Sequence, residues 1–197
     1  MRPGKNIRLF QNPFLEQCTY VHPAVPLLLW GPVSAYTFSR GILRGDIDFI
    51  TSMLLVIAGL FIWSLSEYVL HRWVFHFTPH GALQERVAFL IHGIHHEDPQ
   101  DERRLLMPPA AAIFIASLFY ALFYGVLGSV NANPFFAGFI LGYLAYDYTH
   151  FAVHFWNPKS QLLKKLKQNH MKHHFVTPDA RYGVSNMFWD KIFGTRG

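Results

Sequence analysis

Long apolar stretches separated by short polar segments occupy most of the chain. The stretch from Phe49 to Leu70 contains one charged residue, Glu67, and the stretch from Leu105 to Tyr146 contains none. A helix needs about 20 apolar residues to cross the roughly 30 Å hydrocarbon core of a bilayer, so the second stretch is long enough for two crossings. The segment "GSVNANP" supplies a turn between them. The pattern therefore predicts membrane spans at residues 49–70, 106–129 and 135–153, with a shorter, proline-containing span at 22–39.

These spans predict an all-α integral membrane protein with a four-helix transmembrane bundle. Charged residues make up only 15% of the chain and hydrophobic residues 51%, but composition leaves open a soluble all-α protein with buried core helices. The first twenty residues lack the apolar core of a signal peptide. The whole chain, 1–197, is expected to form one domain.

Lysine and arginine residues set the predicted orientation of the bundle. They gather before the first span, between the second and third spans, and after the fourth, and positively charged loops remain in the cytoplasm. This predicts a cytosolic N-terminal segment, 1–21, and a cytosolic helical cap built from 71–105 and 154–197. The net charge is +5, and the run of lysines after the fourth span is interpreted as a solvated or membrane-facing surface, so no nucleic-acid site is expected.

Histidine is frequent, and its positions follow a pattern. The motif His-x-x-His-His occurs twice, in "HGIHH" and "HMKHH", and two further pairs occur in "HRWVFH" and "HFAVH". Under the predicted topology all four groups lie on the cytoplasmic side. The single cysteine, Cys18, excludes a metal site made of cysteines. His22 and His80 stand outside the pattern and are interpreted as ordinary residues. The ten grouped histidines are His71, His76, His92, His95, His96, His150, His154, His170, His173 and His174.

The spacing within each group indicates that the rings can meet. Residues three or four apart lie on one side of a helix, whereas His71 and His76, five apart, are separated by about 140° around a regular helix. That pair converges only where the helix ends, kinks or carries a bulge. Ten imidazoles exceed what one ion accepts, so two metal ions with about five nitrogens each are expected. Nitrogen ligands suit zinc, copper, iron or nickel.

Three acidic residues are candidates for orienting these rings. A metal-bound imidazole usually donates its second N–H to a carboxylate or a carbonyl. Glu67 lies four residues before His71, and Asp147 lies three before His150, near the predicted membrane boundary where an isolated charge is costly. Asp190 is a third candidate, for which a solvated or backbone-capping role is an equal alternative.

The segments around the histidines resemble a known family. "EYVLHRWVFHF", "LIHGIHHEDPQDERRLLMPP", "YDYTHFAVHF" and "LKQNHMKHHFVTPDARYGVSNMFWDKIFGT" are similar to the fatty acid hydroxylase / sterol desaturase superfamily, and within it most like the fatty acid 2-hydroxylases. The similarity covers residues 65–197. It implies a four-span bundle with a cytosolic cap, and two iron ions held by all ten grouped histidines, with no catalytic residue beyond these ligands. Zinc can occupy the same nitrogens in purified protein.

The resemblance also implies an activity. A member of this family is expected to hydroxylate an acyl chain, here at C2 of a fatty acid or acyl lipid, with O2 and two external electrons. Many eukaryotic relatives carry an N-terminal cytochrome domain with an HPGG motif, whereas this chain has only "HPAV" at His22. A separate electron donor is therefore expected, either a cytochrome or a ferredoxin with its reductase. The expected location is a bacterial inner membrane or, in a eukaryote, the endoplasmic reticulum, with the active site facing the cytoplasm.

Three other functions remain open at this point. A carotenoid-ring or sterol hydroxylase would use the same metals on a different lipid, and a desaturase would remove two hydrogens from the substrate. A membrane metal carrier would also use histidine-rich loops. A carrier needs polar residues within its spans to pass an ion, yet 105–146 contains no ionisable group other than tyrosine.

Residues beside the histidines are candidates for a substrate groove. The aromatic ones could contact an acyl chain, or else anchor the protein at the membrane interface. The two that follow the last histidine motif could meet a lipid head group, with a purely structural role as the alternative. The groove candidates are Trp73, Phe77, Tyr148, Phe151, Arg181 and Tyr182.

Overall fold

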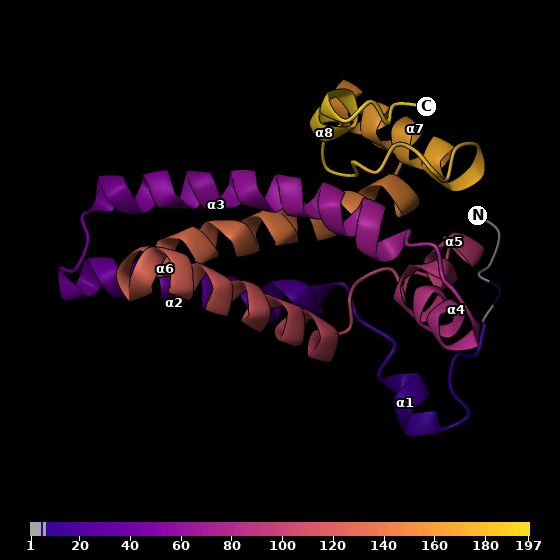
Figure 1. The fold of residues 1–197 in the computed structure, drawn as a ribbon, viewed down its shortest axis with the longest axis horizontal. Helices are drawn as coiled ribbons and strands as arrows, with labels where there is room; N and C mark the ends of the chain where they lie inside the picture. Colours follow the sequence, from indigo (N-terminus) through magenta and orange to yellow (C-terminus); the bar gives the residue numbers. More distant parts are fainter. Residues whose placement is uncertain (1–4, 6) are drawn as a thin grey trace. The chain divides into compact units, whose positions relative to one another are not determined.

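The computed structural model describes residue 5 and residues 7–197, and these residues form helices and loops with no strand (Figure 1). The predicted all-α fold is therefore confirmed for the described chain. Two of the helical segments, η1 and η2, are π-helical. In chain order the segments are α1 (Pro13–Gln17), α2 (Ala24–Arg44), α3 (Phe49–Val69), η1 (Leu70–Phe75), α4 (Ala82–Ala88), η2 (Phe89–Gly93), α5 (Ile94–Glu97), α6 (Pro109–Phe155), α7 (Gln161–Phe175) and α8 (Phe188–Ile192).

The chain forms two compact units. The apolar unit comprises Val21–Ser64 and Leu106–Ala145. The histidine unit comprises Met1–Tyr20, Leu65–Leu105 and Tyr146–Gly197. Helices α3 and α6 contribute residues to both units, and every histidine of the four groups belongs to the histidine unit.

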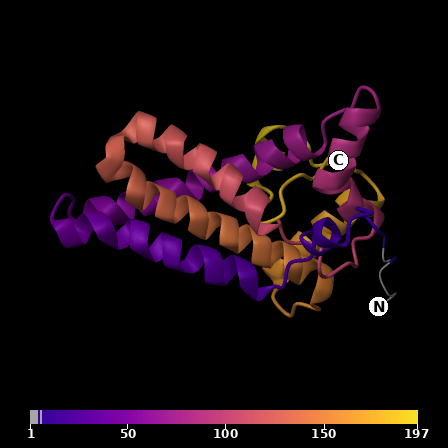
Figure 2. The same ribbon diagram turned by 90° about the horizontal axis from the view of Figure 1, so that it is seen from below.

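Helix α6 is divided by a break within the apolar unit. Gly128 has a φ of 73° and a ψ of 167°, which lie outside the helical range. Glycine adopts these values without steric strain because it has no Cβ atom. The two arms fold back on each other (Figure 2), and the Tyr120 hydroxyl of one arm donates to Asn133 Oδ1 of the other at 3.0 Å. The turn predicted in "GSVNANP" is thus present at Gly128. Pro134, which was expected in the turn, lies inside the second arm.

Glycines allow α3 and the second arm of α6 to approach closely. A Cβ atom at Gly59 would lie 2.0 Å from the carbonyl oxygen of Phe135, and one at Gly138 would lie 2.0 Å from that of Val56. In lipid, helices associate through such close packing because the surrounding chains are as apolar as the side chains. Helix α2 joins the pair through the buried hydroxyl of Ser34, which donates to a backbone carbonyl of α6 at 3.1 Å.

Two helices of the described chain are long and apolar enough to cross a bilayer, Phe49–Phe75 and Pro109–Phe155. Only 22% and 17% of their most apolar windows are buried. Core helices of a soluble protein would be mostly buried, so this exposure favours a membrane protein over the soluble alternative. The break at Gly128 splits the longer helix into two arms, and α2 overlaps the predicted span at 22–39.

The N-terminal segment packs within the histidine unit on the loop that follows α5. Arg104 in that loop donates to the Tyr20 hydroxyl at 3.0 Å and to Asp101 at 3.0 Å, and it also pairs with Glu16. The Arg86 side chain donates to a backbone carbonyl of the same segment. A stretch in which the sequence shows no recognisable motif is therefore held by ion pairs and hydrogen bonds.

Candidate metal centre

A π-helical turn brings His71 and His76 together. Helix α3 continues into η1, where backbone hydrogen bonds join residues five apart, and the His76 N–H donates to the His71 carbonyl at 3.2 Å. A π-turn places residues five apart on one side of the helix, and the two ring centroids lie 5.1 Å apart. Of the three ways in which this pair could converge, the structure uses a bulge, a feature that is frequent at functional sites.

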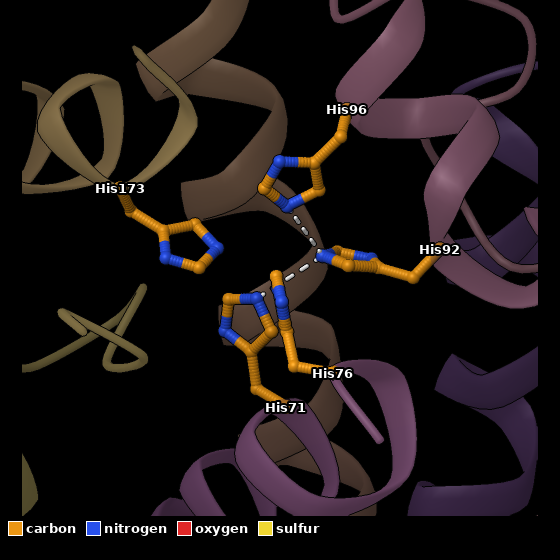
Figure 3. Close-up of side chains that lie close together, drawn as sticks. All are labelled: His71, His76, His92, His96 and His173. Carbon is orange, nitrogen blue, oxygen red and sulfur yellow. Dashed lines mark hydrogen bonds between the residues drawn. The ribbon is translucent and has the colours of Figure 1, made fainter. Parts of the chain in front are cut away.

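Five histidines form what we call the first histidine group (Figure 3). Each offers one ring nitrogen, and these nitrogens all lie within 4.8 Å of one another. Nε2 of His92 lies 3.1 Å from Nε2 of His71 and 3.1 Å from Nε2 of His96. The group comprises His71 and His76 at η1, His92 of η2, His96 of α5 and His173 of α7.

The other five histidines form the second histidine group, with ring nitrogens that also lie within 4.8 Å of one another. Nε2 of His170 lies 2.8 Å from Nε2 of His154 and 3.0 Å from Nε2 of His174. Nε2 of His150 lies 3.0 Å from Nε2 of His95. The group comprises His95 of α5, His150 and His154 at the end of α6, and His170 and His174 of α7.

Each His-x-x-His-His motif serves both groups. On α7 the outer two histidines of the motif join the second group and His173 joins the first. On η2 and α5 the outer two join the first group and His95 joins the second. Each residue of a helix is rotated by about 100° from the one before it. Measured from the first histidine of the motif, the last one is therefore rotated by about 40° in one direction and the middle one by about 60° in the other. The three rings of one motif, which were expected to converge, therefore divide between two sites.

Both groups have the dimensions of a metal site. Metal–nitrogen bonds of about 2.0–2.1 Å place neighbouring ligand nitrogens roughly 3–4 Å apart, close to the 2.8–3.1 Å between paired Nε2 atoms here. Nδ1 of His71 donates to the Tyr182 carbonyl at 2.6 Å, and Nδ1 of His173 donates to the Ala180 carbonyl at 2.7 Å. Each of these rings then presents the lone pair of Nε2 to the group. The donor set fits one metal ion in each group.

Burial keeps the imidazoles neutral. Desolvation, reinforced by the charges of neighbouring histidines, lowers the pKa of His92, His95 and His170 well below the usual 6.5. The same causes lower the pKa of His76 to about 4 and that of His96 to about 3. Metals bind the neutral ring, so these side chains can accept an ion at neutral pH without first losing a proton.

Comparisons with known proteins decide the family. Residues 56–195 match the family model described as fatty acid hydroxylase. The chain belongs to the fatty acid hydroxylase family. The resemblance carried by the histidine motifs is therefore confirmed, and the protein is an oxidoreductase of the hydroxylase type.

Several relatives of this hydroxylase cover nearly its whole length. A dihydroceramide fatty acyl 2-hydroxylase of Arabidopsis thaliana is 37% identical over 189 residues, which are 95% of this chain and 79% of the plant protein. The fatty acid 2-hydroxylase of Homo sapiens is 35% identical over 209 residues, 96% of this chain and 56% of the human protein. A solved structure of full-length scs7p, in which only the hydroxylase domain is visible, matches with a TM-score of 0.89 and 35% identity over 94% of this chain and 70% of that chain.

Two of the three acidic candidates of the hydroxylase bind a loop. Glu67 accepts hydrogen bonds from the backbone N–H groups of Val184 and Ser185 at 2.8 and 2.7 Å. The buried carboxyl of Asp190 accepts hydrogen bonds from the backbone N–H groups of Tyr182 and Gly183. Since Nδ1 of His71 donates to a carbonyl of this loop, Glu67 reaches that ring through the backbone and not through a direct bond. Asp147 is buried one turn before His150, and its orienting role remains a prediction.

The groove candidates occupy different environments in the hydroxylase. The guanidinium of Arg181 donates to Thr177, to Asn169 and to the Gly197 carbonyl. These bonds correspond to the structural role that was the alternative to contact with a lipid head group. Tyr182 is buried, and its ring packs against three rings of the first histidine group. Trp73 is exposed, Phe77 and Tyr148 are half-buried, and Phe151 is buried against neighbouring aromatic rings.

Sequence reasoning missed the backbone acceptors of the first histidine group. The carbonyls of Ala180 and Tyr182 hold two of its rings, and a carbonyl is present in every residue, so no side-chain pattern marks them. Asn169 was also missed, although it lies one position before a motif histidine. Its amide bridges Gly183 and Arg181, at 3.3 and 3.2 Å.

Proposed function

We propose that this hydroxylase adds a hydroxyl group at C2 of a fatty acyl chain, either free or within a ceramide-type lipid. The observation that carries the proposal is the pair of five-histidine groups in a chain of this family. The two groups adjoin, since the rings of His96 and His174 lie 4.3 Å apart. The named relatives from Arabidopsis thaliana and Homo sapiens are 2-hydroxylases of fatty acyl substrates, which supports the position of attack.

The ten histidines are the proposed ligands of two iron ions. When bound, iron would supply oxygen-activating chemistry for a C–H bond that has no acidic proton, which side chains alone do not provide, and the external donor would supply the electrons. The protein residues hold the rings in place and limit access of water. The Tyr182 ring lies 5.5–5.7 Å from those of His71, His76 and His173, so it covers one side of the first group.

The proposed arrangement in the membrane has four spans, formed by α2, α3 and the two arms of α6. The positions of the loops rich in lysine and arginine support a cytoplasmic location for both termini and for the histidines. Electrons come from a separate protein in this proposal. The chain has one cysteine, Cys18, which is too few for an iron–sulfur cluster of its own.

Expression in a host that lacks hydroxylated lipids tests the proposal. Cells grown under ¹⁸O2 should accumulate 2-hydroxy fatty acids that carry one ¹⁸O atom, measured by mass spectrometry of hydrolysed lipids. His173→Ala should abolish the product and lower the bound metal, since it removes a ligand of the first group. His80→Ala is the matched control, because His80 is exposed and outside both groups, and it should retain activity.

The same measurement separates the alternatives. A product that has lost two hydrogens and gained no oxygen would identify a desaturase. Labelled oxygen in a sterol or carotenoid, with unchanged fatty acids, would identify a different lipid substrate. Full activity in His173→Ala would refute the assignment of the ligands.

A further inference from the structure

One segment of the C-terminal region supports the first histidine group at two points. The Ala180 carbonyl accepts from Nδ1 of His173 at 2.7 Å, and the Tyr182 carbonyl accepts from Nδ1 of His71 at 2.6 Å. We call residues 180–185 the acceptor loop. A hydrogen bond at Nδ1 fixes both the orientation of the ring and the nitrogen that is left for a metal. The loop therefore decides where two of the five Nε2 atoms of this group point.

Two buried carboxylates hold the acceptor loop by its backbone. Asp190 accepts from the N–H groups of Tyr182 and Gly183 at 2.8 and 2.9 Å, and Glu67 accepts from those of Val184 and Ser185 at 2.8 and 2.7 Å. Four consecutive N–H groups thus bind two carboxylates, which are only 1% and 3% exposed. Each carboxyl group accepts two of these bonds, so a shift of the loop would break four hydrogen bonds to buried groups. The loop has little freedom to shift while both carboxylates are in place.

The backbone of the acceptor loop is tightly constrained. A Cβ atom at Gly183 would lie 1.9 Å from the Asn186 carbonyl oxygen and 2.8 Å from Asp190 Oδ2, so no larger residue fits without movement of the chain. Arg181 has a φ of 64°, in the left-handed region that residues other than glycine seldom adopt. Its guanidinium is held by three hydrogen bonds, which offset the cost of that conformation.

The second histidine group has no comparable support from this loop. Its five rings come from α5, α6 and α7, and the close Nε2 contacts of these rings are with one another and not with residues 180–185. Within the described part of the chain, Nδ1 of His170 and Nδ1 of His174 have no hydrogen-bond partner. The two groups therefore have equal numbers of histidines but unequal surroundings.

We infer that Glu67 and Asp190 are positioning residues for one of the two metal sites only. They fix the acceptor loop, and the loop sets the rings of His71 and His173 in the first histidine group. Loss of either carboxylate should weaken binding of the first ion and leave the second ion in place. The inference rests on the proposed metal-binding role of the histidines, but it does not depend on which lipid is hydroxylated.

Metal binding by purified full-length variants tests this inference. Iron or zinc is added to the chelated protein in detergent, and the content is measured by mass spectrometry against protein concentration. Glu67→Ala and the milder Asp190→Asn should each lower the affinity of one site by about 10–100-fold, as is usual when a group that orients a ligand is lost. At a free-metal concentration that only just fills both intact sites, the number of ions per chain should fall from about two to about one. Glu67→Gln should restore much of the binding, because its amide oxygen can still accept from both N–H groups.

Double variants identify the site that is lost. In the Glu67→Ala background, His76→Ala in the first group should remove no further metal, whereas His154→Ala in the second group should remove the remaining ion. Asp101→Ala is the matched control, since it removes a carboxylate elsewhere in the histidine unit and should keep two ions. Equal weakening of both sites, or two unchanged affinities in folded Glu67→Ala and Asp190→Asn, would overturn the inference. If the variants lose one ion as expected but the unchanged protein forms no 2-hydroxy product, the proposed substrate is wrong and the inference about the metal sites stands.

Discussion

Replacing Arg104 with alanine should release the N-terminal segment from the histidine unit. The Arg104 side chain is only 5% exposed, and it donates to the Tyr20 hydroxyl at 3.0 Å, to Thr19 Oγ1 at 3.1 Å and to Asp101 at 3.0 Å. It also pairs with the carboxylate of Glu16. The variant therefore removes bonds to four residues at once and not a single bond.

The cost can be estimated from the contacts. Removing one partner of a buried ion pair costs about 3–5 kcal/mol, because the other charge is left buried. Glu16 keeps hydrogen bonds from the backbone N–H groups of Leu9 and Phe10 at 3.0 and 2.8 Å, so we take the lower end, about 3 kcal/mol. In a chain of 150–250 residues each kcal/mol shifts the melting temperature by about 2–4 °C, which gives a decrease of about 6–12 °C.

Thermal unfolding in detergent, followed by loss of the monodisperse peak, measures this shift. Limited proteolysis should show earlier cleavage between residues 5 and 20. Arg103→Ala is the matched control, because its exposed guanidinium only stacks on the Tyr20 ring at 3.8 Å. Such a contact contributes about 0.5–1 kcal/mol, or at most about 4 °C. Equal shifts for the two arginine variants, or an unchanged Arg104→Ala protein, would refute the reasoning.

Three further predictions concern packing, acid and metal. Gly138→Ala places a Cβ atom 2.0 Å from the Val56 carbonyl oxygen and should cost about 1–3 kcal/mol or more, whereas Gly125→Ala, with nothing within 4 Å, should be neutral or stabilising in the same thermal assay. Lowered pKa values of His76 (about 4) and His96 (about 3) mean that the unfolded chain binds more protons below pH 6.5. The metal-free protein should therefore lose stability as the pH falls from 6.5 to 4, and a flat profile would contradict this. Chelation should lower the melting temperature of loaded protein, since an ion at 100 times its Kd contributes about 2.7 kcal/mol; no change on chelation would argue against bound metal.

The gathering of the histidines was largely predictable, because they are grouped by their spacing and by the predicted side of the membrane. Ten histidines chosen from the sequence are the ten that the structure gathers into two groups. The five-residue spacing of His71 and His76 also required a break in regular helix, and η1 provides it. Spacing along a helix gives a direction for each ring but not its target, so the division of each motif between two sites was not predicted.

The parts that escaped prediction depend on backbone atoms and on contacts distant in sequence. Glu67 was predicted to face the ring of His71 from its helical position, yet its hydrogen bonds go to Val184 and Ser185, more than a hundred residues away in the chain. Arg181 carries a charge that suggested a lipid head group, but its donors are used within the fold. The buried contacts of Arg104 were not predicted either, because burial of an arginine is a property of tertiary structure.

The reciprocal use of the two His-x-x-His-His motifs has a consequence for how such a centre can arise or decay. Since α5 and α7 each contribute to both groups, losing either helix would leave neither set of five complete. A site for a single ion would already need both helices, because each set of five draws ligands from α5 and from α7. For the same reason, a displacement of α5 or of α7 should disable both histidine groups together.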